Sequence, residues 1–180
     1  MLYVKSTADA PFVESAPAKS EPFTITTEQQ VATVTDVLTQ TTFGVSGTNY
    51  TPKTDIKKGA SGIESDAVYA AQLAGDKGSI QLRSSNSNSG IVTTASGGNA
   101  RKIVVEWNAD TATARILDIY GSDTPFTAAT ELYNNGKGTK IGSIKRSETT
   151  LEIEGNYPYI GFRSNSGAMY ITKIEITYEK

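Results

Sequence analysis

The chain has 180 residues, with 17 basic and 19 acidic side chains, no cysteine and no histidine. This length suits one domain with a substantial core, and a net charge of -2 lacks the basic excess of nucleic-acid-binding proteins. Without cysteine or histidine the chain has no disulfide, no thiolate or imidazole metal ligand and no Ser-His-Asp triad. Any catalysis would fall to carboxylates, lysine, tyrosine, serine and threonine.

The beginning of the chain is typical of a connecting segment. Residues 1–21 contain prolines among Ala, Ser, Glu and Lys, without hydrophobic periodicity, and are expected to form a flexible tether. A folded domain is expected over residues 22–180. The sequence has neither an apolar stretch long enough to span a membrane nor the layout of a signal peptide, so an exported protein would have lost its leader.

The rest of the chain is rich in Thr, Ser, Gly, Tyr and Ile, a composition that favours strands. Segments 26–40 and 127–136 show modest helical spacing and are the two candidates for short helices. Apolar residues alternate with polar ones, or with other apolar ones, in a set of predicted strands. These are residues 79–83, 102–108, 114–122, 150–155, 159–163 and 170–180.

The alternation also predicts which side chains are buried. In segment 102–108 it places Trp107 on one face with Ile103 and Val105, so a core position is expected for Trp107. In the last segment the expected buried face consists of Tyr170, Thr172, Ile174, Ile176 and Tyr178. Turn-forming sequences such as SGGN, NNGKG and EGNYP recur between the strands. A spacing of about ten residues between turns favours an antiparallel sandwich.

One phrase occurs twice, about eighty residues apart. Residues 79–90 read SIQLRSSNSNSG, and residues 159–169 read YIGFRSNSGAM. Both contain a strand whose apolar residues face the core, followed by an arginine and a polar turn. Arg83 and Arg163 are therefore predicted to lie off the core face, each beside a turn.

Five blocks read, in order, SIQLRSSNSNSGIVTTASGG, ARKIVVEWN, ARILDIYGS, ELYNNGKGTKIGSI and YPYIGFRSNSGAMYITKIEITYEK. Together they resemble a β-sandwich module of surface and secreted proteins from gut-type anaerobic bacteria. The resemblance covers residues 34–180. It implies an all-β, antiparallel β-sandwich of jelly-roll type, similar to galactose-binding domains and carbohydrate-binding modules, and it brings no catalytic motif with it.

Six residues are candidates for contact with a ligand: Tyr50, Tyr69, Arg83, Asn86, Arg163 and Asn165. A tyrosine ring can pack against the C–H face of a sugar, and an arginine fork can bind paired hydroxyls or a carboxylate. Each has a plainer alternative. Tyr69 could begin a buried strand, the arginines could bond turn carbonyls or acidic residues, and asparagine is common in turns.

No cofactor is expected, although oxygen-rich turns leave room for a structural calcium ion. Glu152 and Glu154 project from one strand face, which is typical of a solvated surface and not of a glycosidase pair. The expected function is non-catalytic carbohydrate binding, as an accessory module of a larger exported or cell-surface protein. Its partners would be a glycan or polysaccharide and neighbouring modules of the same polypeptide, with no nucleic acid and no membrane insertion.

Two other functions remain open from the sequence. One is a structural or adhesive spacer, or a protein-interaction domain, without a small ligand. An exposed apolar patch on one sheet would favour it, whereas a polar concavity floored by an aromatic ring would favour a sugar. The other is a hydrolase that uses two carboxylates across a cleft.

Overall fold

A computed structural model describes residues 31–84, 89–134 and 137–180, and residues 31–180 form one compact unit. The predicted tether at residues 1–21 and the start of the predicted domain lie outside the described residues. Within these described residues, eleven strands account for most of the regular structure, and two short helical segments accompany them. The protein is therefore all-β, as the sequence predicts.

The strands are β1 (Thr33–Leu38), β2 (Gly47–Ile56), β3 (Val68–Asp76), β4 (Ser79–Arg83), β5 (Gly90–Ala95), β6 (Asn99–Trp107), β7 (Ile116–Ser122), β8 (Thr139–Lys145), β9 (Thr150–Glu152), β10 (Tyr159–Ser164) and β11 (Ala168–Glu179). The helical segments are α1 (Gln40–Phe43) and the 3-10 turn η1 (Ala129–Tyr133).

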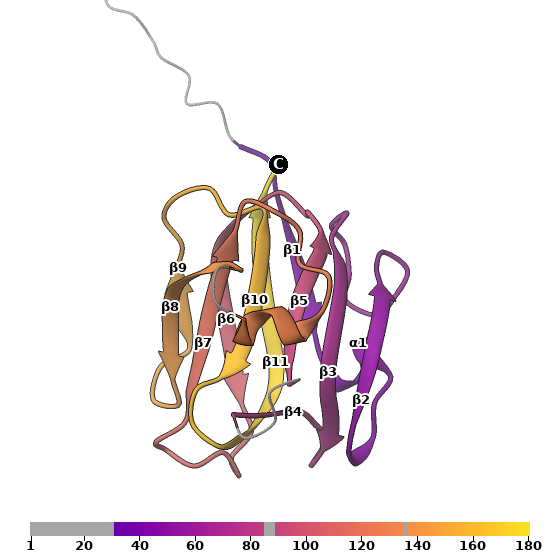
Figure 1. The fold of residues 1–180 in the computed structure, drawn as a ribbon, viewed down its shortest axis with the longest axis vertical. Helices are drawn as coiled ribbons and strands as arrows, with labels where there is room; N and C mark the ends of the chain where they lie inside the picture. Colours follow the sequence, from indigo (N-terminus) through magenta and orange to yellow (C-terminus); the bar gives the residue numbers. More distant parts are fainter. Residues whose placement is uncertain (1–30, 85–88, 135–136) are drawn as a thin grey trace, which may run out of the picture. The chain divides into compact units, whose positions relative to one another are not determined.

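The strands form two antiparallel layers (Figure 1). The front sheet has the order β8-β7-β10-β5-β3-β2, and the back sheet has the order β9-β6-β11, with β1 and β4 sharing the other side of β11. Strand β3 joins the layers, because its last residues pair with β4 through a tight turn at Lys77 and Gly78. Both turn residues have positive φ, of 55° and 70°, as a two-residue type I′ hairpin requires.

The space between the layers holds the main core. Ile80 and Leu82 of β4, and Ile160 and Phe162 of β10, are fully buried, which confirms the core positions predicted for these four residues. Trp107 is 9% exposed and packs in this core, and its indole N–H donates to the Glu148 carbonyl at 2.8 Å. The core position predicted for Trp107 is confirmed.

Two local predictions are wrong. Residues 33–38, inside the segment with helical spacing, form strand β1, and only residues 40–43 are helical; β-branched residues favour the strand. In β11 the buried face changes parity at an irregularity between Ile171 and Lys173. An extra residue at such a bulge rotates the alternation, so Ile171 is buried where Tyr170 and Thr172 were expected.

A buried polar network explains why an acidic residue lies in β1. Asp36 is fully buried, and its carboxylate accepts hydrogen bonds from the backbone N–H groups of Glu64 and Ser65, both at 2.8 Å. The hydroxyls of Ser65 and Tyr69 donate to its other oxygen, both at 2.6 Å. Four donors to one carboxylate compensate for its loss of water, and the network ties β1 to β3.

The front sheet carries a smaller apolar cluster on its outer face. It consists of Ala70, Val92, Phe126 and Leu132, and η1 contributes Leu132. Figure 1 shows η1 lying across this face, in front of β10 and β5. The second segment predicted to be helical, 127–136, therefore contains one 3-10 turn that covers the sheet.

Candidate functional site

The two turns of the repeated phrase meet at the lower end of the sandwich, where β4 ends and β11 begins. The Gly167 backbone N–H donates to the Ser84 hydroxyl at 2.6 Å, and the Ser84 N–H donates to the Gly167 carbonyl at 3.3 Å. Arg83 is opposite Ala168 in the register of β4 and β11. The fold thus brings together two polar turns that are about eighty residues apart in the sequence.

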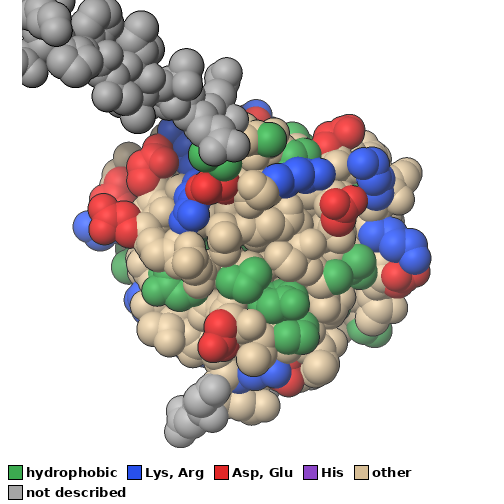
Figure 2. Space-filling model, turned by 90° about the horizontal axis from the view of Figure 1, so that it is seen from above, with side chains coloured by type: hydrophobic (Ala, Val, Ile, Leu, Met, Phe, Trp, Pro, Cys, Tyr) green, Lys and Arg blue, Asp and Glu red, His purple; other side chains and the backbone are tan. Residues whose placement is uncertain are grey.

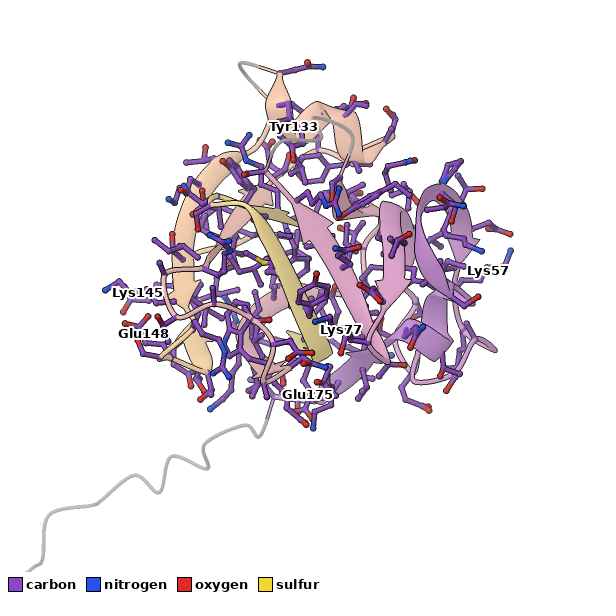
Figure 3. The ribbon with its side chains drawn as sticks, turned by 90° about the horizontal axis from the view of Figure 1, so that it is seen from below. Lys57, Lys77, Tyr133, Lys145, Glu148 and Glu175 are labelled. Atoms are coloured by element: carbon purple, nitrogen blue, oxygen red, sulfur yellow. The ribbon has the colours of Figure 1, made fainter. Side chains whose placement is uncertain are left out.

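Beside these turns lie two groups of arginine and tyrosine side chains, Tyr50 with Arg83, and Arg163 with Tyr133 and Tyr120, which together we call the arginine–tyrosine row. The Arg83 guanidinium is 5.4 Å from the centre of the Tyr50 ring. The Arg163 guanidinium is 4.5 Å from the centre of the Tyr133 ring and 5.5 Å from that of Tyr120. Tyr133, labelled in Figure 3, lies at η1 in this view from below. Its hydroxyl donates to the Ser89 carbonyl at 2.8 Å.

The side chains of the arginine–tyrosine row are in contact with one another and with the backbone. Burial raises the pKa of Tyr50 to about 12, with the Arg83 guanidinium opposing part of the rise; burial also raises the pKa of Tyr133, against the influence of Arg163. Arg163 donates to the Leu132 carbonyl at 2.7 Å. Because tyrosine rings and a backbone carbonyl already engage these guanidinium groups, the plainer alternative describes Arg163 better than a ligand-binding role.

Two other predicted residues, Tyr69 and Asn165, do not join the row. Tyr69 is fully buried and bonds Asp36 and Tyr178, so the expectation that it contacts a surface ligand is wrong. Asn165 is exposed, but its amide donates to Asp118 at 2.7 Å, which gives it a structural partner. Asn86 lies outside the described residues.

Asp118 explains the position of Asn165. It is a nearly buried acidic residue on the outer face of the front sheet. Burial by itself would raise its pKa, but hydrogen bonds from Lys140, Asn165 and Ser143 outweigh that effect and lower the pKa. The Lys140 ammonium is 2.7 Å from the carboxylate, and the Ser143 hydroxyl is 2.8 Å away. This carboxylate is saturated by its own neighbours.

A polar hollow lies at the other end of the sandwich, where β7 ends and β8 and β10 begin. We call it the upper groove; its volume is about 410 Å³. It is lined by Gly121, Ser122, Asp123, Thr124, Gly138, Thr139, Asn156 and Tyr157. Figure 2 views the molecule from this end, and hydrophobic side chains show in several separate areas, at the middle of the face and toward its edges.

Tyr157 gives the groove an aromatic wall. Its ring lies so close to the backbone of Gly121 that a Cβ atom at that position would overlap it. The ring also packs against the main core, and the Tyr157 carbonyl accepts a hydrogen bond from Ala100 at 3.2 Å. The ring is therefore held in place before any ligand arrives, which lowers the entropic cost of binding.

The polar side of the groove comes from the turn after β7. The Ser122 hydroxyl donates to the Thr124 carbonyl at 2.7 Å and accepts from the Thr124 N–H at 3.1 Å. This tight turn leaves the Asp123 side chain exposed. Asn156 is exposed as well, so residues with a carboxylate, a carboxamide and a hydroxyl line the same hollow as one tyrosine.

The lining has the groups that could bind a polar ligand. The lining contains one acidic residue, Asp123, whereas glycosidases generally place two carboxylates around the scissile bond. Within residues 31–84, 89–134 and 137–180, no three acidic side chains gather in a way that could hold a metal ion. Donors and acceptors beside an aromatic ring are the groups that bind sugar hydroxyls and the C–H face of a sugar.

A second hollow is smaller and mostly apolar. Its volume is about 160 Å³, and it lies between Pro52 to Thr54 of β2, residues 70–72 of β3 and residues 127–130. Ligand pockets usually have volumes of roughly 300 to 1,000 Å³, so the upper groove is the better candidate. Neither hollow is lined by a residue of the arginine–tyrosine row.

Sequence reasoning missed the upper groove because its lining comes from three separate loops. The sequence EGNYP predicts only a turn, and Asp123 belongs to none of the predicted strands or quoted blocks. A usable signal existed in the pairing of a strand glycine, Gly121, with a tyrosine that follows another turn. Glycine inside a strand often marks a close approach by another group.

No model of a known protein family matches the chain, and no curated protein sequence matches it. The assignment to an all-β sandwich therefore rests on the strand order and the burial pattern. In the part of the chain that the structure describes, no helix has the length and apolar character to cross a membrane.

Proposed function

We propose that the protein is a non-catalytic carbohydrate-binding module of a larger exported or cell-surface protein, and that the upper groove is its binding site. The observation that carries the proposal is a preformed Tyr157 ring beside the exposed polar side chains of Asp123 and Asn156. A sugar would stack its C–H face on the ring and direct its hydroxyls to the carboxylate and the carboxamide.

An adhesive module with an apolar docking face has less support. Val31, with 48% exposure, is the one large hydrophobic side chain that is exposed in residues 31–84, 89–134 and 137–180. Surfaces that bind proteins through apolar contacts normally present a contiguous patch. The proposed similarity to jelly-roll and galactose-binding domains rests on the sequence resemblance alone.

The test is a binding screen with matched variants. The wild-type protein is expected to bind at least one polysaccharide on a glycan array and to melt at a higher temperature when that ligand is present. Asn156→Ala removes one exposed carboxamide and should weaken binding by about fivefold, because a hydrogen bond contributes about 1 kcal/mol. Arg83→Ala, in the arginine–tyrosine row, is the control and should bind as the wild type does.

Two results would contradict the proposal. One is a blank array together with an unchanged melting temperature across a polysaccharide panel. The other is a ligand whose affinity falls with Arg83→Ala and stays constant with Asn156→Ala, which would move the site to the lower end of the sandwich.

A further inference from the structure

The residues that line the upper groove carry only negative charge. Among its lining residues Asp123 is the only one that carries a charge. Its side chain is exposed, and no lysine or arginine in the described residues forms an ion pair with it. An unpaired carboxylate in a partly enclosed hollow gives the groove a negative potential.

The basic side chains that border the groove do not neutralise it. Lys137 and Lys140 flank Gly138 and Thr139, and Arg101 bonds the carbonyl of Gly155, next to Asn156. Each of them pairs with a carboxylate outside the lining: Lys137 with Glu131 at 3.6 Å, Lys140 with Asp118 at 2.7 Å, and Arg101 with Glu179.

These pairings have a consequence for the ligand. A uronic acid or a sulfated sugar would bring a second negative charge next to Asp123, and the three bordering cations of the described residues, Arg101, Lys137 and Lys140, are each paired with another carboxylate. Like charges at close range repel, and the repulsion grows where the protein excludes water. A neutral sugar meets no such cost, and two of its neighbouring hydroxyls can donate to the two oxygens of one carboxylate.

We propose that the upper groove selects neutral saccharides over acidic ones, and that Asp123 is the residue that determines this choice. The inference rests on the proposed carbohydrate-binding function and adds the class of sugar. Asp123 acts in two ways: it accepts hydrogen bonds from the hydroxyls of a neutral ligand, and it repels anionic ligands.

The experiment compares three proteins by isothermal titration calorimetry: the wild type, Asp123→Asn, and the control Glu64→Gln. Glu64 is an exposed acid that does not line the groove, so its replacement changes the net charge equally. The probes are neutral gluco-, galacto- and manno-oligosaccharides and an oligogalacturonate of matched length. Asp123 is exposed on a turn, and melting curves of all three proteins check that they are folded.

The wild type is expected to bind the preferred neutral oligosaccharide at least about tenfold more tightly than the oligogalacturonate. Asp123→Asn should weaken neutral binding and strengthen oligogalacturonate binding, so the two affinities change in opposite directions. Glu64→Gln should leave their ratio unchanged. Higher salt should improve only oligogalacturonate binding to the wild type, because salt screens the repulsion.

The inference is overturned if the wild type binds oligogalacturonate as tightly as any neutral probe, or if Asp123→Asn leaves the ratio unchanged. If the wild type binds none of the probes of either class, the carbohydrate-binding proposal itself fails. The two failures are therefore distinguishable.

Discussion

The buried network around Asp36 offers a direct test of how the two sheets are held together. Asp36→Asn keeps the shape of the side chain but replaces one acceptor oxygen with an NH2 donor. The amide oxygen can still accept from the N–H groups of Glu64 and Ser65. The NH2 group then faces the hydroxyls of Ser65 and Tyr69, which now donate to the carboxylate at 2.6 Å.

The expected loss follows from those two contacts. A hydrogen bond to a charged group contributes roughly 1.5 to 3 kcal/mol, and both hydroxyls can partly recover by turning to accept from the amide. We therefore expect Asp36→Asn to reduce the free energy of unfolding by about 3 kcal/mol. For a domain of this size, 1 kcal/mol corresponds to about 2 to 4 °C, so the melting temperature should fall by about 6 to 12 °C.

Thermal and urea unfolding followed by circular dichroism measure this loss. Asp66→Asn is the matched control, because Asp66 is exposed and lies 3.6 Å from Lys180. An exposed pair of this kind contributes well under about 1 kcal/mol, so the control should melt close to the wild type. If Asp36→Asn also melts within about 2 °C of the wild type, the network does not hold the sheets and this account of β1 is wrong.

Three further predictions follow from the described contacts. Burial raises the pKa values of Tyr69 and Tyr178, so the folded protein keeps two protons that the unfolded chain loses near pH 10. The contribution of these tyrosines to the free energy of unfolding should therefore be constant below that pH and decrease above it. A series of melting curves at alkaline pH that shows no decrease would contradict this prediction. Gly121→Ala should displace the Tyr157 ring, lower stability by about 1 to 3 kcal/mol and weaken saccharide binding; unchanged unfolding and binding would refute the close approach. Arg163→Met should cost about 1 kcal/mol in a urea titration by removing a carbonyl partner and a ring contact, and a loss of saccharide affinity would argue against the upper groove.

The fold could be predicted largely from the sequence because apolar residues recur at every second position in several strands. Ile80, Leu82, Ile160 and Phe162 alternate with residues that face away from the core, and all four are fully buried. The pattern fails where a buried polar residue or a β-bulge interrupts the alternation. Strand β1 places a charged Asp36 on its inward face, which hides the period, and the irregularity in β11 shifts the parity of the residues before it.

The candidate site was harder to predict, because it depends on contacts between distant segments. The sequence predicts that Arg83 and Arg163 each lie beside a polar turn, but it does not indicate that the two turns meet or that tyrosine rings pack on the guanidinium groups. Tyr69 looked available for a ligand because its partner Asp36 lies 33 residues earlier. The groove at Tyr157 exists only once the ends of three strands have been assembled.

The most direct test of the upper groove is residue-by-residue mapping of a bound saccharide by NMR. Backbone amide shifts of the labelled protein are recorded while the tightest-binding neutral oligosaccharide is added. The largest changes should fall on residues 121–124, 138–139 and 156–157. Changes that gather instead around Tyr50, Arg83 and Tyr133 would place the ligand at the opposite end of the sandwich and contradict the assignment.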